Sequence, residues 1–479
     1  MCEKYLTLPT HYDYNEVNWP YRVTDEITGT NRVYNISEYD NAGHKLRIEY
    51  PNGDRMEYAY GQAYRLEKAD GYMSGGMLVK NEVTEWDDVN IMKKKSTMLG
   101  DINYSFDNIY QLTSYSNSTA EQHDLVYAYD AAGNRDGLTI NGTLSNYSAN
   151  DLNQLTLADG ISTFIYDANG NMTGKGADTY SWDYNNRLVW AVVGANNISY
   201  KYNYQDIRLE KNNNGNITRY YYNGTKLLAE GDGTKITKIY TNDNEGVLGM
   251  TRKIYEQSSS YHYQSLYYLF DNLGSVAAIT DDSGKPVQYY QYDPYGRITN
   301  AVTDPVNSLT FVGRYFGQRD WDTGFTYFWH RWYDADLGRW ISRDPIGVKG
   351  GVNLMRYIKN NPITKIDSSG FCDGNPDIYD DQTESPTLTD TDNFNPNPPP
   401  QQIQTNILTQ DSNPQTITCL KNKTFHKGVF SLCMLAAAQL CTNMLGDVEG
   451  LTGQPEVAGG TWAVCMAAAA FVCLDSATW

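Results

Sequence analysis

Two Asp-x-x-Gly motifs lie in the last third of this chain. Asp344 precedes Gly347, Asp367 precedes Gly370, and the two Asp residues are 23 positions apart. Two carboxyl groups that share one proton can hydrolyse a peptide bond, because the ionised one activates water while the protonated one polarises the carbonyl. A fixed cation beside them would stabilise the developing oxyanion. The alternative is that both motifs only cap turns.

The composition favours a β-rich framework for these residues. The chain has 479 residues, including 41 Tyr and 40 Gly, a combination typical of many short strands and tight turns. The formal net charge of −19 argues against binding to nucleic acid, which requires an excess of Lys and Arg. The six His are scattered, so the sequence predicts no metal site and no cofactor.

An internal repeat runs through the first segment of the chain. It consists of an aromatic residue, an Asp and a turn containing Gly or Asn, and copies lie 16 to 23 residues apart after Asp107. The copies are Tyr39-Asp40, Phe106-Asp107, Tyr129-Asp130, Tyr166-Asp167 and Trp182-Asp183, with looser copies at Asp151 and Asp206. We expect each Asp to accept hydrogen bonds from turn amides, and Gly or Asn to adopt positive φ. Because a single hairpin is unstable, the hairpins must stack into a continuous spiral of strands.

Cysteine usage divides the chain after Phe371. Residues 3–371 contain no Cys, whereas residues 372–479 contain six of the seven. Residues 372–418 carry seven Asp, one Glu and seven Pro but no Lys or Arg, which predicts an extended acidic linker.

Residues 419–479 are predicted to form a small α-helical hairpin. Its two Ala-rich segments each carry two Cys eight positions apart, on one face of a helix and about 12 Å apart. In an antiparallel hairpin one register pairs Cys433 with Cys473 and Cys441 with Cys465, although sequence does not fix disulfide connectivity. A membrane-active peptide and an ordinary packed hairpin are both compatible with this pattern.

The repeats and the motifs after residue 266 resemble the RHS (YD-repeat) family, which includes polymorphic toxins and the C components of insecticidal toxin complexes. The motifs that carry the resemblance are Tyr267-Tyr268-Leu269-Phe270-Asp271, Tyr292-Asp293-Pro294-Tyr295-Gly296-Arg297, Arg331-Trp332-Tyr333-Asp334, Leu337-Gly338-Arg339-Trp340 and Arg343-Asp344-Pro345-Ile346-Gly347. The resemblance implies a mainly β fold: a complete or partial shell of YD-repeat hairpins, capped by an RHS core. The implied domains are a shell (1–265) and a core (266–371), followed by the linker (372–418) and a variable C-terminal cargo (419–479).

The resemblance also implies a single-turnover aspartic-type autoprotease. The self-cleaving relatives use two Asp and an upstream Arg, which map here to Asp344, Asp367 and Arg331. The implied cleavage site lies between Phe371 and Cys372, where the composition also changes. Ser368 stands where the family usually has Pro, which would loosen the geometry of attack.

The implied partners are the chain's own C-terminal peptide as cargo, an immunity protein and a target-cell membrane. The N-terminal residues do not form a secretory signal, so we expect secretion or surface display as part of a longer chain or through a dedicated system. The competing hypotheses are a structural surface or adhesion protein without cargo, and a gene fragment.

Overall fold

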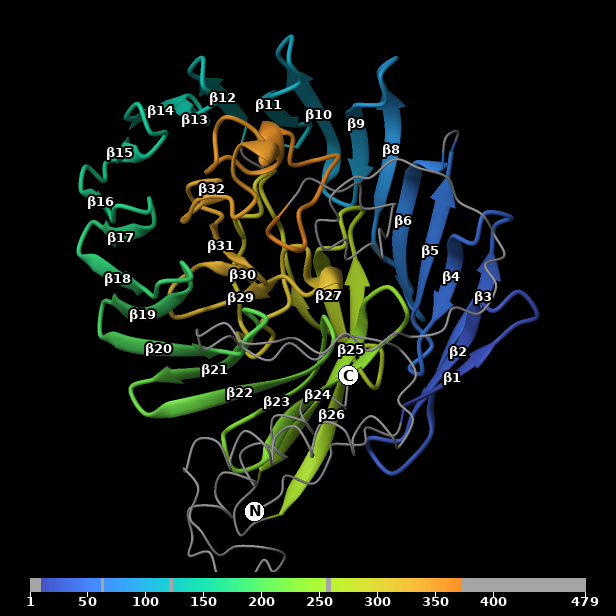
Figure 1. The fold of residues 1–479 in the computed structure, drawn as a ribbon. Coiled ribbons are helices and arrows are strands. Elements are labelled where there is room, and N and C mark those ends of the chain that lie inside the picture. The colour runs from blue at the N-terminus through green and yellow to red at the C-terminus, as the bar shows by residue number, and fades with distance from the viewer. Residues whose placement is uncertain (1–9, 62–63, 120–123, 256–259, 372–479) are drawn as a thin grey trace, which may run out of the picture. The chain divides into compact units, whose positions relative to one another are not determined.

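The computed structural model describes residues 10–61, 64–119, 124–255 and 260–371. In these residues the regular structure consists of β-strands and short 3-10 helices, which confirms the prediction of a mainly β fold (Figure 1). The predicted linker, the helical hairpin and all four Cys proposed for disulfides lie outside the described residues. No helix of the described part combines the length and apolarity of a membrane span.

The first sheet contains fifteen strands, and each pairs antiparallel with the strand before it in the chain, except that β8 pairs with β6 beside β7. They are β1 (Thr10–Tyr14), β2 (Pro20–Asp25), β3 (Arg32–Tyr39), β4 (Lys45–Glu49), β5 (Arg55–Tyr60), β6 (Leu66–Met73), β7 (Gly76–Val79), β8 (Asn81–Trp86), β9 (Met92–Thr97), β10 (Gly100–Phe106), β11 (Leu112–Asn117), β12 (Leu125–Tyr129), β13 (Arg135–Ile140), β14 (Thr143–Ala149) and β15 (Leu155–Ala158). This order is a continuous meander of hairpins.

The second sheet continues the meander with thirteen strands in chain order. They are β16 (Phe164–Tyr166), β17 (Met172–Lys175), β18 (Asp178–Trp182), β19 (Leu188–Val193), β20 (Asn196–Tyr202), β21 (Arg208–Asn213), β22 (Asn216–Asn223), β23 (Lys226–Gly231), β24 (Ile236–Asn242), β25 (Val247–Tyr255), β26 (Tyr261–Phe270), β27 (Val276–Asp281) and β28 (Pro286–Tyr289). The proposed boundary between residues 265 and 266 therefore falls inside β26.

A third, four-stranded sheet belongs to the segment that carries the two Asp-x-x-Gly motifs. Its strands are β29 (Gln318–Arg319), β30 (Thr326–Phe328), β31 (Arg331–Asp334) and β32 (Arg339–Trp340), and the segment's 3-10 helices are η3 (Gly313–Tyr315), η4 (Gly347–Gly350) and η5 (Ile358–Asn360). We call residues 290–371 the core segment.

The hairpin turns follow the chemistry predicted from the repeat. At Asp130, the carboxylate Oδ1 accepts the backbone N–H groups of Ala132 (2.9 Å) and Asn134 (2.8 Å), and Gly133 has φ +75°. The same pair of bonds, from the residues two and four positions later, is made by Asp40, Asp87, Asp107, Asp183, Asp271, Asp281 and Asp293. The Asp side chain thus satisfies amides that the tight turn would otherwise leave unpaired.

The structure corrects the prediction for the two looser copies of the repeat, in which Asn rather than Asp caps the turn. The capping residue is Asn150 rather than Asp151, since the Asn150 side chain accepts the N–H groups of Leu152 and Gln154 at 3.0 Å. Likewise Asn203 caps the second turn, and Asp206 takes the positive-φ position (φ +64°) that Gly fills elsewhere. An Asn side-chain carbonyl accepts the same hydrogen bonds as a carboxylate. A search for Asp alone therefore assigned the cap of these two turns to the wrong residue.

The core segment packs against the tyrosine-bearing faces of the strands. Buried rings of β12, β18 and β20 contact rings of this segment, which in Figure 1 lies in orange within the curve of the strands. The ring pairs are Tyr127–Tyr295 (5.2 Å), Tyr180–Phe325 (5.3 Å) and Tyr200–Trp332 (4.9 Å) between centroids. The hairpin wall and the core segment therefore share one aromatic core.

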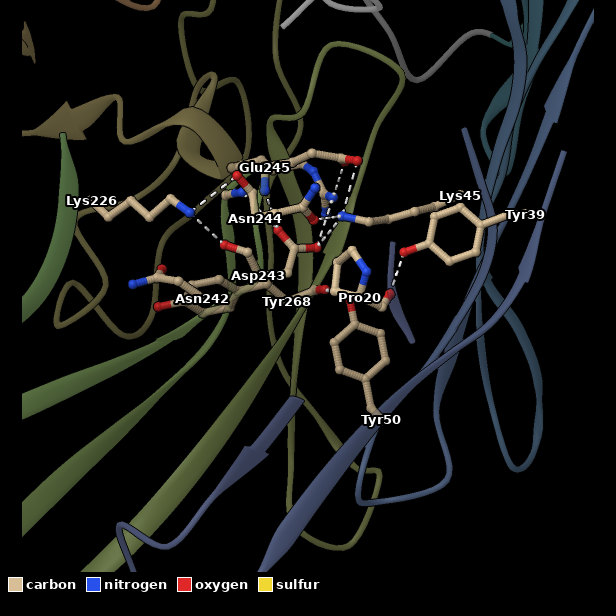
Figure 2. Close-up of polar contacts among 12 residues, drawn as sticks. Pro20, Tyr39, Lys45, Tyr50, Lys226, Asn242, Asp243, Asn244, Glu245 and Tyr268 are labelled. Carbon is tan, nitrogen blue, oxygen red and sulfur yellow. Dashed lines mark hydrogen bonds and ion pairs between the residues drawn. The ribbon is translucent and has the colours of Figure 1, made fainter. Parts of the chain in front are cut away.

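The beginning of the first sheet contacts the end of the second along a line that we call the seam. There Arg32 donates to Thr251 (2.7 Å), and the Tyr50 hydroxyl donates to the carbonyl oxygen of Tyr268 (2.7 Å). Figure 2 shows a third seam contact, in which Lys45 Nζ lies 2.8 Å from Asp243 Oδ2. Residues some 200 positions apart thus hold the meander in a returning curve.

Candidate active site

The side chains of Arg331, Asp344 and Asp367 lie together at the end of the core segment. Arg331 begins β31, Asp344 follows β32 and Asp367 follows η5. The Arg331 Nη1 atom is 3.1 Å from Asp344 Oδ2, and its Nη2 atom is 2.9 Å from Asp367 Oδ2. One guanidinium group therefore joins the two carboxylates.

Arg331 is held rigidly in this position. Its side chain is 3% exposed, and its guanidinium carbon lies 4.0 Å above the centre of the Trp340 ring. Its Nε–H donates to the backbone carbonyl oxygen of Gly370. Burial between an aromatic face and three acceptor groups fixes the direction of the cation.

The Asp367 turn presents the end of the core segment to this cation. Asp367 Oδ1 accepts the backbone N–H groups of Gly370 (2.7 Å) and Phe371 (3.1 Å). Gly370 has φ +76°, and a Cβ atom there would lie only 2.6 Å from the carbonyl oxygen of Phe328. The site therefore requires glycine at residue 370, both for conformation and for space.

Burial raises the pKa of both carboxyl groups. Burial raises the pKa of Asp367 to about 6, and the opposing effects of Arg331 and the backbone N–H groups cancel only part of this increase. Burial also raises the pKa of Asp344, which is the less enclosed group, against the effect of Arg331. Asp367 is thus suited to hold a proton near pH 6, and acid–base hydrolysis would need Asp344 to be its ionised partner.

A small cavity of about 20 Å³ lies between these groups. Its lining includes Arg331, Asp344, Asp367 and Phe371. This volume is enough for one water molecule, and the polar lining offers it hydrogen-bond partners.

Two features of the site were not predicted from the sequence. Arg331 contacts the carbonyl group of Gly370, one residue before the carbonyl of the predicted cleavage site, and Cys372 lies outside the described residues. Trp340 and His330 were assigned no role, although Trp340 supports Arg331 and His330 stacks on Phe371. No local pattern in the sequence pointed to these two roles. The described residues contain no group of three His, Cys, Asp or Glu side chains that could hold a metal ion.

The fold and site can now be compared with known proteins. The family model described as the teneurin YD-shell matches residues 77–363, which is more than half of the chain. The chain belongs to the teneurin YD-shell family. This assignment confirms the resemblance to YD-repeat proteins that the turn motifs carried.

Curated relatives of this YD-shell chain include nucleases and toxin subunits. The chain is 34% identical over 262 residues to the tRNA3(Ser)-specific nuclease WapA of Bacillus spizizenii, covering 51% of this chain and 11% of that protein. It is 25% identical over 410 residues to toxin subunit YenC1 of Yersinia entomophaga, covering 70% of this chain and 42% of that protein. The chain thus spans between about a tenth and two fifths of these relatives, and it is a toxin-related shell.

Solved structures of the same fold include TcdB2–TccC3 without its hypervariable C-terminal region. The TM-score is 0.63 at 21% identity, over 76% of this chain and 20% of that one. This likeness in backbone shape supports the YD-shell fold independently of the sequence motifs.

Proposed function

We propose that this chain is the C-terminal part of an RHS-type polymorphic toxin or toxin-carrier, whose core segment cuts the chain between Phe371 and Cys372. The observation that carries the proposal is the arrangement of Arg331, which binds both carboxylates and the last turn before the cleavage site. The residues after the cut would be the cargo of the shell. The chain would act as an enzyme once, on itself.

The proposed reaction is hydrolysis of the Phe371–Cys372 peptide bond. Asp344 takes a proton from a water molecule as its oxygen adds to the carbonyl carbon, and protonated Asp367 donates to the carbonyl oxygen. The carbon–nitrogen bond then breaks, the nitrogen of Cys372 takes a proton, and Phe371 keeps the new carboxyl group. The reaction consumes one water molecule and needs no cofactor.

Arg331 contributes positioning and charge. By binding the Gly370 carbonyl, it fixes the turn that precedes the scissile bond. Its positive charge lies at the Gly370 carbonyl, one residue before the carbonyl where negative charge would develop, and buried charges stabilise an oxyanion more strongly than charges in water.

The relatives support a cargo role for the residues after Phe371. WapA is named as a tRNA nuclease, YenC1 as a toxin subunit, and the solved TccC3 chain has a hypervariable C-terminal region. By analogy, we propose that residues 419–479 are a variable toxic cargo, that an immunity protein neutralises it, and that a target-cell membrane is its destination. Secretion or surface display would then follow.

A purely structural role is the competing hypothesis, and one observation favours it. Asp344 Oδ1 accepts the N–H of Ile346 (3.0 Å), as the Asp residues of the YD turns accept the amide two positions later. Both Asp-x-x-Gly motifs would then be turn caps in a surface or adhesion protein without cargo.

Mass spectrometry of the purified chain separates the two hypotheses. Self-cleavage converts the 54.2 kDa chain into two fragments, and Asp344→Asn remains intact. Asp40→Asn, in a YD turn with the same cap, is the matched control and should still cleave. A single intact species in the wild-type chain, unchanged in Asp344→Asn, contradicts the proposal.

A further inference from the structure

His330 lies directly against the residue at the proposed cleavage site. Its imidazole ring stacks on the Phe371 ring with 3.7 Å between centroids and 26° between planes. Both residues are partly buried, and Phe371 also lines the small cavity beside the two carboxylates. The stack therefore joins the side chain of the scissile residue to the wall of the site.

The backbone around His330 holds its ring in a fixed place. His330 lies in the turn between β30 and β31, and its N–H donates to the carbonyl oxygens of Phe328 and, at 3.3 Å, Ser369. The preceding residue, Trp329, has φ +50°, a left-handed conformation that is costly for a bulky residue. A strained turn that is kept next to a candidate site is more often functional than incidental.

The chemistry of His330 suits a stacking surface better than a proton carrier. Burial and the charge of the neighbouring Arg331 lower the pKa of His330 to about 4. The ring is therefore neutral at the pH where one of the two carboxylates is protonated. A neutral planar ring can stack on an aromatic side chain without competing with Arg331 for the carboxylates.

We propose that His330 is a positioning residue that selects an aromatic side chain at residue 371 and holds the scissile carbonyl in line with Asp344 and Asp367. This inference rests on the proposed self-cleavage. Two anchors would then fix the residue before the cut: the Asp367 turn holds its backbone N–H, and His330 holds its ring. With only the backbone anchor, the carbonyl at the free end of the turn can rotate away from the attacking water.

The test is the rate of self-cleavage in variants of the full chain. His330→Ala should cleave between about tenfold and a hundredfold more slowly, because small misplacements of a reacting group carry costs of this size. His330→Phe, which keeps a planar ring, should restore most of the rate. His44→Ala is the matched control, since His44 stacks in a similar way on Tyr60 (4.6 Å, 26°) far from the site, and it should cleave at the wild-type rate.

A second pair of variants tests selection at residue 371. Phe371→Leu should slow cleavage when His330 is present and have little further effect in the His330→Ala background, because both changes remove one interaction. Phe371→Leu leaves the turn between β30 and β31 unchanged, so this variant reads out the stack even where a change at His330 disturbs folding. None of these variants should change the pH at which the rate is half-maximal, because His330 does not exchange the proton.

The outcomes separate the two proposals. A wild-type chain that stays intact overturns the self-cleavage on which this inference rests. A wild-type chain that cleaves, together with a His330→Ala variant that cleaves equally fast, overturns only the role of His330. Effects of His330→Ala and Phe371→Leu that multiply independently would also contradict it.

Discussion

Two buried clusters of cations and carboxylates contain the same kinds of residue but have different roles: one stabilises the fold, and the other is the candidate active site. At the seam, Lys45 and, from η3 of the core segment, Arg314 each bind both Asp243 and Glu245, at 2.8 to 3.3 Å. Figure 2 shows Lys45 beside the two carboxylates. In the core segment, one cation, Arg331, serves two carboxylates. Each seam carboxylate therefore pairs with two cations, whereas Asp344 and Asp367 both pair with the same cation, Arg331.

The pKa values follow this difference. Burial pushes the pKa of Asp243 upward, but Lys45 and Arg314 together outweigh it and hold the pKa well below its usual range. Burial raises the pKa of Asp367 to about 6, because Arg331 alone does not outweigh it. A carboxylate that two cations keep ionised stabilises a junction in the fold, whereas a carboxyl group with a raised pKa keeps a proton available for chemistry.

The largest expected difference between the clusters concerns catalysis. Asp367→Asn removes the proton donor and should lower the cleavage rate by at least about a thousandfold at any temperature where the variant is folded. Asp243→Asn should cleave at the wild-type rate at any temperature where it is folded. Gel densitometry over time measures both rates. Equal losses in the two variants would show that cleavage depends only on folding.

The free energy of unfolding should depend strongly on the seam. Asp243→Asn leaves two buried cations short of one shared carboxylate and should lower the free energy of unfolding by about 3 kcal/mol or more. Glu49→Gln breaks the half-exposed pair with Arg47 and should cost less than about 1 kcal/mol. Urea denaturation measures both. A small effect of Asp243→Asn would remove the structural role assigned to the seam.

Much of this architecture is readable in the sequence, because its causes are local. Asp130 binds amides two and four positions later, so the composition of a short window fixes the turn. The grouping of Arg331, Asp344 and Asp367 was implied only by the family resemblance. The contact of Lys45 with Asp243 and the stacking of His330 on Phe371 arise from how the meander folds back, and no local pattern encodes them.

Gly370→Ala sharpens the comparison within the core cluster. The added methyl group meets the Phe328 carbonyl at a φ that disfavours alanine, so the Asp367 turn must shift. Cleavage should slow by about a hundredfold, since a displacement near 1 Å has effects of this order. Gly53→Ala has a similar φ (+85°) with nothing nearby, and it controls for backbone strain alone. Equal rates in both variants would show that the turn does not position the cut.

The two clusters should also differ in pH dependence: the core cluster in the cleavage rate, and the seam in the stability of the fold. The cleavage rate should fall as pH rises through about 6, where Asp367 loses its proton, and fall again in acid as Asp344 becomes protonated. The stabilisation by ionised Asp243 is fully present above about pH 4 and is lost as pH falls further, because its folded-state pKa is depressed. A cleavage rate that is flat from pH 5 to 8 would contradict the assignment of Asp367 as the acid.

The central claim is that the core cluster cuts the chain at one bond, and N-terminal sequencing of the smaller fragment tests it most directly. The account predicts a fragment that begins at Cys372 in the wild-type chain and no fragment from Asp344→Asn or Asp367→Asn. A fragment that begins elsewhere, or the same fragment from either Asp variant, would show that the cluster is not the agent of cleavage.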